Sequence, residues 1–242
     1  MPSTLANAVK FDRGSPTIAI VNESSDVDVR ELRKAVKAFQ KQLDRDFFPR
    51  WGWRADLIFE QDLPPRSMRL TIKEVDTDPD DEGLLGYHII DGLPRTEVFT
   101  RDTDGTRFRD YYSVISHEIL EMIADPGANL YADGYLNGDE NKPALISFEV
   151  CDPVQDRLYT INGIKVSDFV TPEWFEPGRK RGSVEFSHLG SVNLPFKMTP
   201  GGYVDAVYRG KADTFWGKPP KKGKRRRRVH ARKKLGHIFS KP

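Results

Sequence analysis

The alternation of apolar and polar positions at the start of the chain predicts a strand followed by a helix. Residues 16–22 are a short apolar run that ends in turn formers, which is typical of a buried strand. From 28 to 48, apolar side chains recur at three- and four-residue spacing, so this segment is expected to pack one helical face on a sheet. Asp28 and Glu31 are placed as a capping pair at its start, and Pro49 with the turn at Trp51-Gly52-Trp53 is expected to stop it.

The rest of the pattern predicts an α+β fold with more strands and one further strong helix. Strands are expected at residues 55–61, 68–75, 84–90, 95–100, 144–152 and 158–166, the last a hairpin turning at Asn162-Gly163. The helix is expected from 111 to 124, ended by Asp125-Pro126-Gly127. Residues 76–82 are acidic and predict a loop, and 91–94 suit a hairpin connection. Beyond 167, prolines and short apolar stretches predict irregular structure with a few short strands.

Composition and charge divide the chain into unlike parts. Residues 217–242 hold twelve Lys and Arg and no acid, which leaves 26 basic and 36 acidic side chains in the other 216 residues. We expect a main domain at 1–176, a loop-rich β extension packed on it at 177–216, and a disordered polybasic tail at 217–242. With one cysteine, no secretory signal and no apolar run long enough for a membrane span, a cytoplasmic or phage-virion location is expected.

The chemistry is concentrated in the predicted helix at 111–124, whose sequence includes SHEILEMIADP. With 3.6 residues per turn, His117 and Glu121 lie one turn apart on the same face, while most neighbouring positions are apolar. A histidine and carboxylates in such a helix would cost several kcal/mol each if buried and unpaired. A shared divalent cation removes that cost, and the spacing lets two side chains reach one ion. The alternative is a core histidine bonded to Glu121.

Together with the acidic segment FEVCDPV downstream, these motifs resemble the zincin-like metallopeptidases, in particular a bacterial and phage-encoded group. The resemblance covers about residues 16–176 and is specific over 113–126 and 147–154. It implies a twisted mixed sheet with a backing helix and an active-site helix. It also implies a bound Zn²⁺, a peptide or protein substrate, and an edge strand that flanks the substrate cleft.

Carried over by position, the resemblance makes His117 a metal ligand, Glu118 the general base and Glu121 the second ligand. The family usually has histidine at the position of Glu121. Zinc accepts a carboxylate there, but the added negative charge weakens the ion as a Lewis acid and makes Ca²⁺ or Mn²⁺ alternatives.

The third ligand is expected from the segment after the helix, and Glu149 is preferred. Asp125 and Asp152 are the competing candidates, as ligands or as groups that orient His117. Cys151 could be a thiolate ligand but is expected to be mainly structural. His88, on the predicted edge strand, is a candidate for substrate binding.

The polybasic tail, with Arg225, Arg226, Arg227 and Arg228 at its centre, predicts binding to nucleic-acid phosphates without sequence specificity. An anionic membrane or an acidic protein surface is the competing partner. Two functions therefore stand beside each other: a metal-dependent peptidase, and a catalytically inactive zincin-like structural protein, for instance of a phage particle, whose tail holds nucleic acid.

Overall fold

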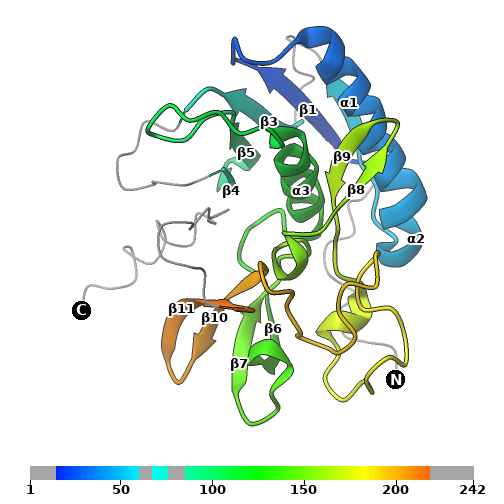
Figure 1. Ribbon diagram of the computed structural model, residues 1–242, viewed down its shortest axis with the longest axis vertical. Helices are drawn as coiled ribbons and strands as arrows, with labels where there is room; N and C mark the ends of the chain where they lie inside the picture. Colours follow the sequence, from blue (N-terminus) through cyan, green and yellow to red (C-terminus); the bar gives the residue numbers. More distant parts are fainter. Residues whose placement is uncertain (1–14, 60–66, 76–84, 219–242) are drawn as a thin grey trace.

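The computed structural model describes residues 15–59, 67–75 and 85–218, and it has an α+β fold built on a twisted mixed sheet (Figure 1). Five strands form this sheet in the order β2-β1-β3-β5-β4. The first four of these run parallel and β4 is antiparallel to β5, so β4 is an edge strand. The strands are β1 (Thr17–Asn22), β2 (Asp56–Phe59), β3 (Met68–Lys73), β4 (Gly86–Asp91) and β5 (Leu93–Phe99). The predicted α+β class with a twisted mixed sheet is confirmed.

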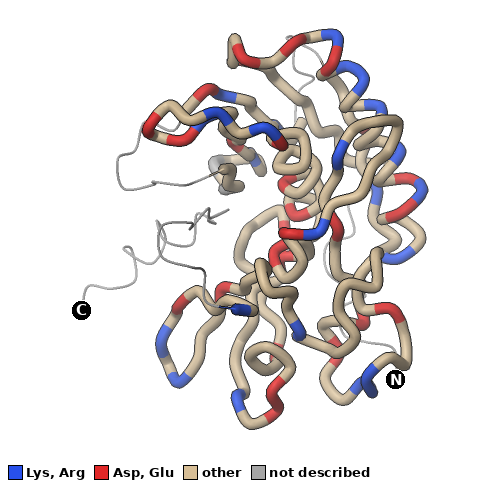
Figure 2. Tube along the Cα trace, viewed as in Figure 1, with Lys and Arg blue, Asp and Glu red and all other residues tan. Residues whose placement is uncertain are grey.

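The long helix predicted for residues 28–48 is α1 (Val29–Gln42), and its start is as expected. Asp28 is the N-cap, and its carboxylate accepts the backbone N–H groups of Arg30 and Glu31. The side chain of Glu31 pairs with Lys34 instead of completing the cap. Figure 2 shows basic and acidic residues alternating along the outer side of this helix, consistent with an amphipathic helix whose other face is buried.

The helical segment ends at the predicted turn of Trp51-Gly52-Trp53, but Pro49 itself does not stop it. A π-helical turn (Leu43–Phe47) follows α1, and a short helix α2 (Phe48–Trp51) follows that turn. Pro49 lies in the first turn of α2, where a missing N–H costs no helical hydrogen bond. The helix ends at Gly52, whose positive φ of 72° forms a left-handed cap.

Helix α3 (Tyr111–Ala124) has the predicted bounds and lies at the centre of the molecule (Figure 1). It packs against β5 and β4 on one side and against the hairpin of β8 (Leu158–Ile161) and β9 (Ile164–Ser167) on another. The hairpin turns at Asn162-Gly163 with φ of 50° and 82°, as predicted. Twelve of the fourteen residues of α3 are buried, so it is a core helix.

A second sheet of four strands, in the order β11-β10-β7-β6, lies below the first in the view of Figure 1. It consists of β6 (Tyr131–Tyr135), β7 (Pro143–Ser147), β10 (Tyr203–Tyr208) and β11 (Lys211–Trp216). Short 3-10 turns complete the fold at Leu136–Gly138, Asp152–Val154 and Pro172–Phe175. The predicted short strands beyond residue 167 are thus present, and β10 pairs with β7 of the preceding region.

Two predicted boundaries need correction. The strand expected at 144–152 ends at Ser147, because the backbone N–H groups of Cys151 and Asp152 donate to a helix side chain instead of a neighbouring strand. The connection expected at 91–94 shrinks to Gly92, whose φ of 74° lets the chain reverse between directly paired strands. The acidic loop at 76–82 and nearly all of the polybasic tail lie outside the described residues. In the described part of the chain, no helix is both long and apolar enough to cross a membrane.

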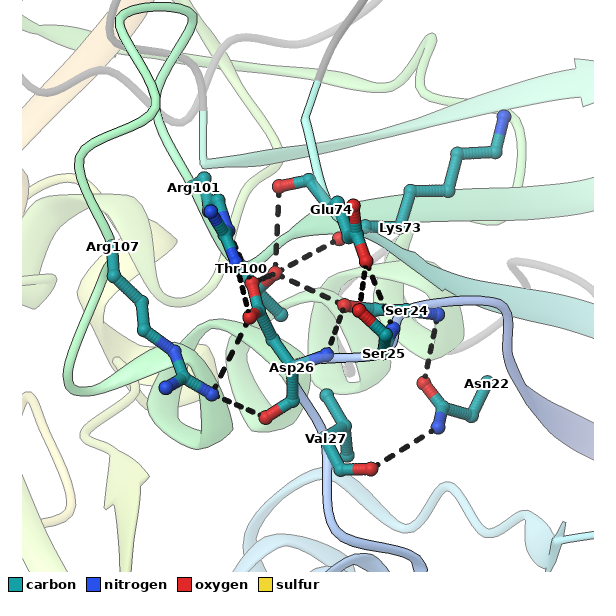
Figure 3. Close-up of polar contacts among 10 residues, drawn as sticks. All are labelled: Asn22, Ser24, Ser25, Asp26, Val27, Lys73, Glu74, Thr100, Arg101 and Arg107. Carbon is teal, nitrogen blue, oxygen red and sulfur yellow. Dashed lines mark hydrogen bonds and ion pairs between the residues drawn. The ribbon is translucent and has the colours of Figure 1, made fainter.

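A polar cluster fixes the loop between β1 and α1 to the segment that follows β5 (Figure 3). The carboxylate of Asp26 accepts two hydrogen bonds from Arg101, both 2.6 Å, and one of 2.9 Å from Thr100. Arg107 lies 3.6 Å from the same carboxylate and also donates to the backbone carbonyl of Asp26. Because residues 100–107 lead into α3, this cluster helps to place the start of that helix.

Candidate metal centre

Helix α3 carries three ionisable side chains into the interior. His117, Glu118 and Glu121 are each 0% exposed. The apolar residues around them place the helix in the core, so these groups are carried inward with it. In Figure 2 the charged positions of α3 are all acidic, as its sequence requires.

The imidazole of His117 meets two carboxylates at a single atom. Its Nε2 lies 2.9 Å from Oε2 of Glu121 and 3.1 Å from Oδ1 of Asp152, which is also fully buried. Ligand atoms placed tetrahedrally ~2.0–2.2 Å from a zinc ion lie about 3.3–3.6 Å from one another. The two contacts at Nε2 fall short of that separation by about 0.2–0.7 Å, so a small outward movement would admit a divalent ion.

The turn after β7 orients the carboxylate of Glu121. Its Oε1 accepts the backbone N–H groups of Cys151 and Asp152 at 3.1 and 3.2 Å. These bonds engage one carboxylate oxygen and direct the other, Oε2, to His117. His117, Glu121 and Cys151 also form a group whose ligand atoms all lie within 4.8 Å of one another. The same turn therefore supplies a carboxylate, a thiol and two backbone donors.

A second group of potential ligands consists of His88, Glu118 and Glu121, again with all ligand atoms within 4.8 Å. His88 comes from edge strand β4 and is 0% exposed. Its Nδ1 lies 3.8 Å from Oε2 of Glu118, and its Nε2 lies 3.2 Å from the backbone carbonyl of Asp125. The structure thus places this residue beside the predicted general base.

The other candidates from the sequence take different positions. Asp125 ends α3 and is fully buried, and its Oδ2 accepts the backbone N–H of Leu130 at 2.9 Å. Glu149, the preferred third ligand, is 1% exposed but belongs to neither of the two ligand groups found among the described residues. Asp152 also belongs to neither of these groups, but its Oδ1 contacts His117 at 3.1 Å, and Cys151 belongs to the first group. Residues Arg225 to Arg228 lie outside the described residues.

Tyr203 on β10 joins the site and was not anticipated from the sequence. Its side chain is 2% exposed, and its phenol lies within the electrostatic reach of Asp152. Burial, followed by the negative charges of Asp152, Asp205 and Glu121, raises the pKa of Tyr203 well above its ordinary value. It lies in a short apolar strand far along the chain, and nothing in its spacing connects it to α3.

Comparisons with protein-family models, with curated proteins and with solved structures found no significant match for this chain. The assignment of a function therefore depends on the site itself. A buried imidazole, carboxylates and a thiol converge there, and these groups could hold a metal ion.

Proposed function

We propose that this protein is a zinc-dependent, zincin-like peptidase, with His117, Glu121 and Asp152 holding the ion and Glu118 acting as general base. The observation that carries the proposal is the meeting of two carboxylate oxygens at Nε2 of His117, next to a further buried glutamate in the same helix. The five-stranded mixed sheet with an antiparallel edge strand beside α3 supports the zincin-like assignment.

The donor types favour zinc over a harder cation. Imidazole and thiol are ligands that suit Zn²⁺, whereas Ca²⁺ and Mg²⁺ prefer oxygen ligands alone. His117 and Cys151 both belong to the first ligand group, so Ca²⁺ is disfavoured there. Mn²⁺ remains the alternative for the carboxylate-rich part of the site.

When bound, the ion would supply a Lewis acid that lowers the pKa of water and polarises a carbonyl group. The contribution of the chain is to place a proton acceptor beside it. The carboxylate of Glu118 would take the proton from water during attack and pass it to the leaving amine. The two backbone donors at Cys151 and Asp152 would hold the carboxylate of Glu121 in position.

Edge strand β4 and an adjoining cavity offer a path for a peptide. The cavity has a volume of about 430 Å³ and is lined by Leu85, which directly precedes β4, and by Ser113 and Val114 in the first turn of α3. Arg107 and Arg109 also line it and would attract a carboxylate. An extended peptide could pair with the free edge of β4 and enter beside His117.

A second candidate function is favoured by the burial of the ligands. His117, Glu121 and Asp152 are all 0% exposed, and closed sites are typical of structural metals. In that case the ion stabilises a catalytically inactive structural protein, and residues 217–242 bind nucleic acid or an acidic protein surface through their basic side chains.

Metal analysis combined with one variant separates these functions. The purified protein should contain zinc, and Glu118→Gln should retain it while losing cleavage of a peptide library. Glu140→Gln, at an exposed position, is the matched control and should cleave as the wild type does. Zinc with no cleavage by any form supports the structural function, and absence of bound metal from the wild type refutes both.

A further inference from the structure

A second set of buried ligands lies beside the proposed metal centre and shares one residue with it. His88, Glu118 and Glu121 are all 0% exposed, and each offers a ligand atom within 4.8 Å of the other two. We infer that these three side chains form a second divalent-cation site, joined to the first through the carboxylate of Glu121. The inference rests on the proposed metal centre, because Glu121 serves both sites.

The hydrogen bond of His88 suits it to metal binding. A backbone carbonyl can only accept, so the contact of 3.2 Å with Asp125 requires a proton on Nε2. A neutral imidazole with this tautomer keeps its lone pair on Nδ1, the atom that faces Glu118 at 3.8 Å. Metal-ligating histidines are commonly oriented in this way, by donating their other ring N–H to a carbonyl or carboxylate.

Gly86 on β4 makes room for the Glu118 carboxylate. A Cβ atom added there would lie 3.2 Å from Oε1 and 3.3 Å from Cγ of Glu118, and 3.1 Å from the carbonyl oxygen of Glu97. The glutamate is therefore held against the backbone of the strand that also carries His88. This packing fixes two ligands of the second site relative to each other.

Occupation of this site has a chemical consequence. Hydrolases with two metal ions hold them about 3.5–4 Å apart, a distance that one shared carboxylate can span. An ion bound to Glu118 engages the lone pairs that would otherwise accept a proton. Excess divalent metal therefore inhibits the proposed peptidase by occupying its base.

Cobalt titration of the full chain tests the two sites separately. Native mass spectrometry should show two Co²⁺ ions per wild-type chain, bound in successive steps. His88→Gln should keep the first step, while its affinity for the second ion should fall by at least about 100-fold. Loss of a residue that only hydrogen-bonds to a metal ligand already lowers metal affinity by about 10–100-fold, and loss of a ligand itself should cost more.

The controls keep this test independent of the proposed function. His117→Gln should lose the first binding step, which assigns that step to the first site. If His88→Gln does not fold, Glu118→Gln removes another ligand and should likewise bind one ion. A single ion in wild type, or two in both of these variants, overturns the second site and leaves the peptidase proposal standing. No bound ion in wild type refutes both.

Discussion

Replacement of Asp26 by asparagine should destabilise the fold through the cluster that joins the β1–α1 loop to the segment before α3. The hydrogen bonds from Arg101 are the main cause that lowers the pKa of Asp26 from 3.8 to about 2. A difference of that size corresponds to an upper limit of about 2.5 kcal/mol. The side chains of Arg101 and Arg107 are 40% and 55% exposed, so solvent screening reduces the expected loss to about 1–2 kcal/mol.

The pH dependence of this loss identifies its electrostatic origin. Because the folded pKa of Asp26 lies below its unfolded value, its contribution is complete above pH 4 and disappears as the pH falls through about 2. Urea unfolding of wild type and Asp26→Asn at several pH values between 2 and 7 measures the difference in free energy. Asp133→Asn, at an exposed position on β6, is the control and should change little. An equal difference at pH 2 and pH 7 would refute the electrostatic explanation.

Three further predictions concern stability. Zinc at a hundred times its dissociation constant should raise the free energy of unfolding by about 2.7 kcal/mol. The melting temperature should therefore exceed that of chelator-treated protein, and an unchanged temperature would contradict the metal centre. Ser116→Ala should lower the free energy of unfolding in urea by about 1–3 kcal/mol, because the Ser116 hydroxyl accepts the buried backbone N–H of Ser167 at 2.8 Å. A decrease below about 0.5 kcal/mol would contradict this. Gly134→Ala should lower the free energy of unfolding, measured by thermal unfolding, by about 1–3 kcal/mol, since the added Cβ would lie 2.3 Å from the ring of Phe196. Unchanged stability would mean that the ring moves aside without cost.

Local sequence patterns correctly predicted the helices and strands whose ends are marked by turn-forming residues. The bounds of α3 follow from its apolar run and from Asp125-Pro126-Gly127, and the β8–β9 hairpin follows from Asn162-Gly163. Pro49 misled because a π-helical turn places it at the start of α2, where proline is tolerated. That turn depends on packing in the folded protein and has no simple sequence signal.

Some residues of the candidate site are brought together by local spacing in the sequence, and others only by tertiary packing. His117 and Glu121 are four positions apart in α3 and share a helical face. Their proximity therefore follows from the helix alone. His88 and Tyr203 come from different sheets, and they reach the site only through the packing of β4 against α3 and of β10 against the turn at Asp152–Val154. Alternation could not choose between Glu149 and its neighbours, because the chain leaves the sheet at Ser147.

The departure of the chain from the sheet after β7 links the fold to the metal. Backbone N–H groups released from strand pairing at Cys151 and Asp152 need acceptors, and Oε1 of Glu121 accepts both. The same turn brings the carboxylate of Asp152 to His117. The hydrogen bonds that satisfy the backbone N–H groups of this turn therefore also position residues that hold the proposed ion. Metal binding should accordingly stabilise this turn more than β1 and β2 of the five-stranded sheet, which carry none of the proposed ligands, so hydrogen exchange at the amides of Cys151 and Asp152 should slow most when zinc is added.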